Sequence, residues 1–182
     1  TESELRIANI HFLREAWSEA ENAYKLFKEF HPKHKESDFV TFRVAMSIYK
    51  QLPDSIDRDL SLAKDAILYF EQVFVNYPQS DYAGSAKDHK NKCLLKLARK
   101  EYYIGNFYMI REVYDSALGR FEDILQKYPD IGIDARTLYG AAISAYHLKK
   151  KGKAKTYYKK LVNSFPKTKW ARRVKSELKG KI

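Results

Sequence analysis

Four segments of this chain share one spacing of residue types. In each, an alanine is followed four residues later by an aromatic residue, three residues later by an apolar one and five residues later by a proline. The four copies are Ala20, Tyr24, Phe27, Pro32; Ala66, Phe70, Val73, Pro78; Ala117, Phe121, Ile124, Pro129; and Ala154, Tyr158, Leu161, Pro166. Spacings of three and four place the first three positions on one face of a helix, and proline ends that helix.

A helix with this face cannot bury it alone, so each copy needs a partner helix upstream. Small residues in the segments before the last two copies, at Gly105, Ala142 and Ala145, would let two antiparallel helices approach closely. Helix pairs punctuated in this way are typical of tetratricopeptide repeats, in which each pair is buried only by its neighbours. We therefore predict an all-α fold, a tetratricopeptide-type α-α superhelix formed as one array over residues 1–182.

The array is predicted to hold about four repeats and a capping helix. Their approximate bounds are 1–34, 37–79, 80–130 and 131–167, with the cap at 168–180. Two insertions stretch the repeat: a loop at 51–62 and a long uninterrupted helix at 80–109. In the cap, Trp170, Val174, Leu178 and Ile182 form one apolar stripe at i+4 spacing. Because the first segment reads as a helix with nothing before it, we expect a further repeat upstream of Thr1.

Composition places most of the charge at one end. The chain is 45% apolar and 31% charged, with a net charge of +11, and residues 149–182 contain fourteen Lys and Arg but only Glu177 as an acid. This region is either a footprint for an anionic lipid, nucleic-acid or protein surface or a solvated outer face. The candidate basic surface consists of Lys149, Lys150, Lys151, Lys153, Arg172, Arg173 and Lys175.

Signals for catalysis, metals and cofactors are weak throughout. His31 and His34 lack carboxylate or thiol neighbours in sequence, and the aspartates at 54–59 lack the glycine and distal glutamate of a calcium loop. Cys93 is the single cysteine and has no C-x-x-C partner. We predict a non-enzymatic protein with no cofactor and no metal.

A peptide-binding surface is the remaining candidate. In such arrays the first helix of each pair lines the concave side, and its residues in the first two units are aromatic or flexible, as suits an extended apolar peptide. The candidates are Leu5, Phe12, Phe39, Phe42, Met46 and Tyr49, with Tyr102 and Tyr139 at the corresponding places in later units. Each could instead pack between helices.

The insertions and repeats together resemble one family, BamD, the outer-membrane lipoprotein of the β-barrel assembly machinery. The resemblance is carried by "DSIDRD", by "VNYPQSDYAGSA" and above all by "LARKEYYIGNFYMIREVYDSALGRFEDILQKYPD". It covers essentially all of residues 1–170. The basic end, with "KKKGKAK" and "WARRVK", is more cationic than the family pattern requires, which makes lipid phosphates or an acidic companion plausible partners there.

The resemblance implies a scaffold on the periplasmic side of the outer membrane, tethered by a lipidated cysteine upstream of Thr1. It implies that the C-terminal repeats dock the last POTRA domain of the barrel subunit BamA, with Arg120 pairing an acid on that domain. It also implies that the N-terminal half holds unfolded outer-membrane proteins and that other assembly lipoproteins are companions. Arg120 lies beside Phe121 but off the packing face, so we expect it to point outward.

Two other functions stay open at this point. One is a generic tetratricopeptide-repeat adaptor for another peptide or protein. The other is nucleic-acid binding through residues 149–182, which is disfavoured because that stretch contains no recognisable recognition module.

Overall fold

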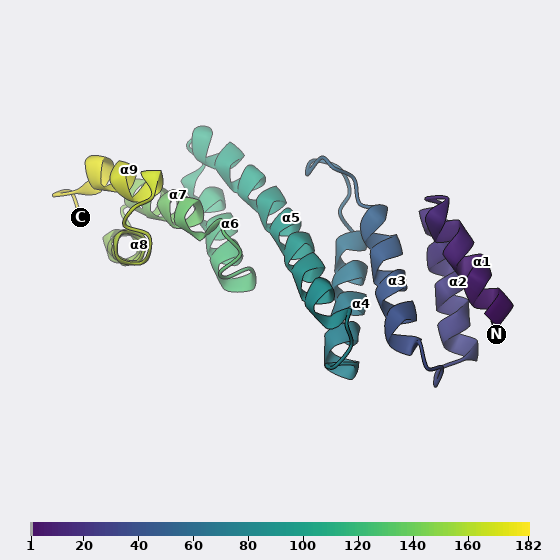
Figure 1. Ribbon diagram of the computed structural model, residues 1–182. Coiled ribbons are helices and arrows are strands. Elements are labelled where there is room, and N and C mark those ends of the chain that lie inside the picture. The colour runs from purple at the N-terminus through teal and green to yellow at the C-terminus, as the bar shows by residue number, and fades with distance from the viewer. Residues whose placement is uncertain (1) are drawn as a thin grey trace. The chain divides into compact units, whose positions relative to one another are not determined.

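The computed structural model describes residues 2–182, and over that range it contains nine α-helices and no strand (Figure 1). This confirms the predicted all-α class. The helices are α1 (Glu2–Leu13), α2 (Trp17–Phe30), α3 (Ser37–Lys50), α4 (Leu62–Asn76), α5 (Ala83–Ile110), α6 (Tyr114–Lys127), α7 (Asp134–His147), α8 (Lys151–Ser164) and α9 (Lys169–Leu178).

The chain forms two compact units, the first ending at Leu97 and the second beginning at Ala98, so that their boundary lies inside α5. In the first unit α1, α2, α3 and α4 pack in sequence, each against the next. In the second unit α6 packs against α7 and α7 against α8, while α9 packs against both α7 and α8. Consecutive helices are therefore neighbours in space, as expected of stacked hairpins.

The repeated motif forms the interior of these hairpins. Its alanine, aromatic and apolar positions lie on α2, α4, α6 and α8, and eleven of the twelve side chains are buried, Tyr158 alone being partly exposed. Tyr24, Phe70 and Phe121 are fully enclosed. The motif is thus a packing rule, because the small residue makes room for the neighbouring helix and the large ones fill the space next to it.

The motif prolines end their helices in one repeated geometry. Each of α2, α4, α6 and α8 stops two residues before its proline. The residue between them has φ near −130° and a positive ψ, and its N–H donates to the carbonyl of the motif's apolar residue at 2.9 Å in all four cases. This conformation lies outside the α region, which the residue before a proline avoids, so the proline fixes where each motif helix ends.

The ring of Phe121 packs between two glycines of the second unit. A Cβ atom added to Gly105 of α5 would lie 2.9 Å from the Phe121 ring, and one added to Gly140 of α7 would lie 2.5 Å from it. The small residue predicted at Gly105 therefore has the expected role. The second contact, through Gly140, was not identified from the sequence.

Three hairpin turns hold non-glycine residues in the left-handed region. Glu15, Glu112 and Lys149 have φ near 60° and lie between α1 and α2, α5 and α6, and α7 and α8. In each turn the next N–H donates to a carbonyl five residues back, as Lys150 does to Ala145 at 2.9 Å. This is the Schellman closure that glycine usually provides, so three side chains here occupy a strained conformation.

The long insertion is helical as predicted: α5 runs without interruption from Ala83 to Ile110. The predicted loop lies between α3 and α4. The cap corresponds to α9, where the Thr168 hydroxyl accepts the N–H of Ala171 and where Val174 and Leu178 are buried.

We expect Gly140→Ala to destabilise the second unit by about 2–3 kcal/mol, because the Phe121 ring is blocked by Gly105 on its other side and cannot retreat. Gly119→Ala is the matched control: it lies in α6 with nothing within 4 Å of the added methyl. Removing that glycine should stabilise the helix by up to about 1 kcal/mol. Urea unfolding of both variants measures the difference, and equal effects would contradict this description of Phe121.

We expect Lys149→Gly to stabilise the protein by about 0.5–1 kcal/mol, because glycine accepts a φ of 59° without steric cost. Lys155→Gly removes the same charge six residues later, at an exposed position inside α8, and should cost up to about 1 kcal/mol. Thermal unfolding should therefore shift in opposite directions for the two variants. A loss of stability in Lys149→Gly would show that the turn is not strained.

Candidate functional site

Arg120 lies on α6 in the second unit, half-exposed, and its guanidinium has a partner within the chain. Nη1 donates to Oε2 of Glu101 on α5 at 2.7 Å. Arg120 also lies close to the backbone of Gly105, where an added Cβ would be 3.2 Å from its own Cβ. The side chain is outside the core, as expected, but any external acid would have to share it with Glu101.

A shallow polar groove of about 480 Å³ lies beside this ion pair. Its walls are Tyr108, Ser116, Gly119, Arg120, Glu122, Asp123 and Gln126. Burial raises the pKa of Glu122, but hydrogen bonds from Lys153 and Tyr157 outweigh it and hold that pKa below its ordinary value. The groove therefore presents the Arg120 guanidinium beside the carboxylates of Glu122 and Asp123.

The six apolar candidates in the first unit have different environments. Leu5 and Phe42 are buried in the core of that unit, where Phe42 stacks on Tyr82 with ring centroids 5.0 Å apart. Their apolar surface packs between helices, which was the alternative to peptide binding for these residues. Phe12, Phe39, Met46 and Tyr49 are partly exposed.

Phe12 and Phe39 are bridged by a cation that the sequence analysis did not single out. The Cζ atom of Arg43 lies 4.2 Å from the ring centroid of Phe12 and 5.0 Å from that of Phe39. Tyr49 packs edge-on against His89 with centroids 5.1 Å apart. The partly exposed side chains thus belong to an ordered aromatic surface on α1 and α3.

The first unit also exposes an apolar groove that was not predicted. It has a volume of about 210 Å³, lies between α1 and α2, and is lined by Glu4, Ile7, Ala23, Leu26, Phe27 and Phe30. Phe30 is 66% exposed and Ile7 and Leu26 are each 53% exposed. Ile7, Leu26 and Phe30 are not motif positions, so the repeat motif does not predict them; Phe27 is the one motif residue in this lining.

The seven basic candidates at the C-terminal end are all exposed. Three of them form ion pairs: Lys150 with Asp115 at 3.3 Å, Lys153 with Glu122 at 2.8 Å and Arg173 with Glu177 at 2.9 Å. Within residues 2–182 no ion pair is found for Lys149, Lys151, Arg172 or Lys175. The excess positive charge is therefore solvent-facing, with the acids of α6 offsetting part of it.

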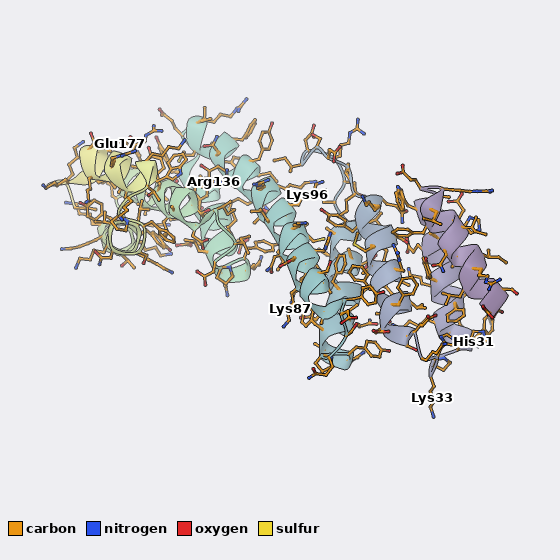
Figure 2. The ribbon with its side chains drawn as sticks, in the orientation of Figure 1. His31, Lys33, Lys87, Lys96, Arg136 and Glu177 are labelled. Atoms are coloured by element: carbon orange, nitrogen blue, oxygen red, sulfur yellow. The ribbon has the colours of Figure 1, made fainter. Side chains whose placement is uncertain are left out.

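Two side chains of types used in catalysis, His31 and Cys93, have structural contacts or are buried. His31, in the turn after α2 (Figure 2), meets Glu4 at 2.8 Å and packs on Phe27. Cys93 is buried, which raises the pKa of its thiol to about 11. In the described part of the chain no group of three or more His, Cys, Asp and Glu side chains is placed to hold a metal ion. No helix among residues 2–182 is both long and apolar enough to cross a bilayer.

Comparison with known proteins gives two matching family models. Residues 1–148 match the YfiO outer membrane lipoprotein model, and residues 136–168 match a tetratricopeptide-repeat model. The second match agrees with the helical hairpins described above and confirms the predicted fold type.

Curated relatives agree with the first match. The chain is 28% identical to the outer membrane protein assembly factor BamD of Rickettsia prowazekii, over 93% of this chain and 67% of that protein. It is 25% identical to BamD of Neisseria meningitidis serogroup A, over 92% of this chain and 66% of that protein. The chain thus spans about two thirds of the length of these relatives.

The order of the helices, the long α5 and the family match over more than half of the chain are consistent with one another. The chain belongs to the YfiO family of outer membrane lipoproteins, whose curated members include BamD.

Proposed function

We propose that this chain is a scaffold of the machinery that assembles β-barrel proteins in the outer membrane. The observation that carries the proposal is the family match over residues 1–148, together with relatives that are named assembly factors for outer membrane proteins. That name describes an assembly factor and not an enzyme, in agreement with the prediction of a non-enzymatic chain. Lipid anchoring on the periplasmic side of the outer membrane is part of this proposal.

The second unit is the proposed docking surface for the POTRA domain of a BamA-like barrel subunit. Arg120 supports this because it is half-exposed at the rim of a polar groove and already holds a carboxylate, Glu101, at 2.7 Å. A guanidinium in such a position can exchange an internal partner for an external one, since exposed ion pairs contribute little to folding. In this proposal Glu101 keeps Arg120 oriented and competes with the acid of the partner.

The first unit is the proposed holding surface for unfolded outer-membrane protein segments. Phe12, Phe39, Met46 and Tyr49 offer partly exposed apolar surface on α1 and α3, and Arg43 keeps the two phenylalanine rings in place. Extended chains with alternating aromatic residues fit such a surface through ring contacts. Leu5 and Phe42 contribute indirectly, by supporting the helices from inside the core.

The docking proposal is tested by titrating the chain with the soluble POTRA domains of a BamA-type subunit. Arg120→Glu should weaken binding by on the order of 2–5 kcal/mol, because it removes a cation from the contact and leaves the partner's acid unpaired. Glu101→Gln should have the opposite effect and tighten binding, because it releases Arg120 from its internal partner.

Lys127→Glu is the matched control, since it makes the same charge change on the exposed face of α6 and should alter affinity less than about threefold. Circular dichroism shows whether each variant is folded. If folded Arg120→Glu binds as the unchanged chain does, Arg120 has no part in docking. If the unchanged chain fails to bind the POTRA domains at all, the docking proposal fails as a whole.

A further inference from the structure

Three arginines recur at one spacing on every second helix of the second unit. Arg99 on α5, Arg136 on α7 and Arg173 on α9 are each 37 residues apart, which is also the spacing between Pro129 and Pro166. They are therefore equivalent positions of the repeat. Arg136 lies on α7 and Glu177, one turn beyond Arg173, on α9 (Figure 2).

Two of these arginines are held by tyrosines of the preceding helix in the set. The Cζ atom of Arg136 lies 4.3 Å from the ring centroid of Tyr102, and that of Arg173 lies 4.9 Å from the ring centroid of Tyr139. The tyrosines are also 37 residues apart. Stacking on an aromatic ring fixes the plane of a guanidinium while leaving its N–H groups available for hydrogen bonds.

The charges on this face are not balanced. Within residues 2–182 neither Arg99 nor Arg136 forms an ion pair, and the Nε atom of Arg136 is buried without a hydrogen-bond partner. Burial lowers the pKa of Arg136; Tyr102 partly offsets this, and the like charge of Arg99 lowers the pKa further. Two neighbouring cations with unused donors are unfavourable for the folded chain by themselves.

Glu177, the acid that contacts this set, is already engaged. Glu177 accepts the Tyr139 hydroxyl at 3.0 and 3.1 Å and the Nε–H of Arg173 at 2.9 Å. Glu177 is therefore the counter-charge of Arg173 on α9. Among the described residues, no carboxylate is found paired with Arg99 or Arg136. Lysines elsewhere in this unit, such as Lys150 and Lys153, do have carboxylate partners.

We infer that the row of Arg99, Arg136 and Arg173, the last two stacked on Tyr102 and on the buried Tyr139, binds an acidic polypeptide segment of a partner protein. Carboxylates are the groups that a planar, pre-oriented guanidinium pairs with best, through two parallel hydrogen bonds. A segment with several Asp or Glu side chains would supply the missing counter-charges along the row. This surface differs from the groove at Arg120 and does not depend on docking to a POTRA domain.

The test is the affinity of a fluorescein-labelled hexaglutamate peptide at 50 mM NaCl, with hexaglutamine as the uncharged comparison. Arg99→Gln is the primary variant because Arg99 is exposed and, among the described residues, no aromatic ring is found stacked on it, so its loss should leave the fold intact. We expect Arg99→Gln and Arg136→Gln each to weaken binding at least about fivefold. Arg136→Lys, which keeps the charge but not the planar fork, should fall between Arg136→Gln and the unchanged chain.

Arg172→Gln is the matched control. Arg172 is exposed and lies next to Arg173, but within residues 2–182 it is not found stacked on an aromatic ring. Its loss should change affinity less than about twofold. Thermal unfolding adds a second readout: Arg99→Gln should leave the melting temperature unchanged or raise it, because it relieves repulsion with Arg136. Loss of binding without loss of stability is the expected signature of a binding residue.

Three outcomes would overturn the inference. They are equal weakening by Arg172→Gln and Arg99→Gln, binding of hexaglutamine as tight as that of hexaglutamate, and a melting temperature that falls in Arg99→Gln together with affinity. Vesicles containing phosphatidylglycerol form a further arm. If they bind in an Arg99-dependent manner while hexaglutamate does not bind, the face recognises a lipid surface and the inference of an acidic polypeptide is wrong.

Discussion

The structure depends on one packing constraint: no hairpin of this chain can cover its own apolar face. The second unit shows the constraint most sharply at Phe121, whose ring is fully buried between glycines of two other helices, α5 and α7. A large ring in α6 thus requires the absence of a side chain at two positions distant in sequence. The same rule of small against large recurs at each copy of the motif, which is why the motif residues are buried while the faces between them are free to carry charge.

That freedom explains how function can be distributed over such a chain. Because packing uses the alanine, aromatic and apolar positions, residues on the other faces of these helices can carry charge. Arg120 is adjacent to Phe121 in sequence, yet it lies at the rim of a polar groove with Glu101. Arg136 and Arg173 lie on helices that precede or cap the motif helices, where tyrosines from the neighbouring helix orient them. A helical array of this kind can present several separate surfaces at once.

Electrostatics distinguishes these surfaces from one another. Arg120 has an internal acid and would exchange it for an external one, whereas Arg99 and Arg136 have none and repel each other. Lys153 of α8 has a structural partner instead. Glu122 of α6 accepts hydrogen bonds from Lys153 and from Tyr157, and these bonds link α8 to α6. Net charge alone, concentrated after residue 148, gave no hint of these differences, because a cation's availability depends on which carboxylates lie within reach.

The sequence by itself determined the helical class, the motif helices and where they end, and the presence of a long helix, expected at 80–109 and found at Ala83–Ile110. These follow from local periodicity and from the conformations that proline excludes. It also carried the family resemblance through the segment at 97–130. The tertiary structure alone decided that Leu5 and Phe42 are buried, that Gly140 makes room for Phe121 and that Arg120 is paired with Glu101. These are contacts between helices, and one-dimensional spacing says which residues share a face but not which face of another helix lies opposite. The row of arginines needed both sources. The sequence shows the 37-residue spacing of Arg99, Arg136 and Arg173, whereas only the folded chain shows which of these arginines pair with a carboxylate.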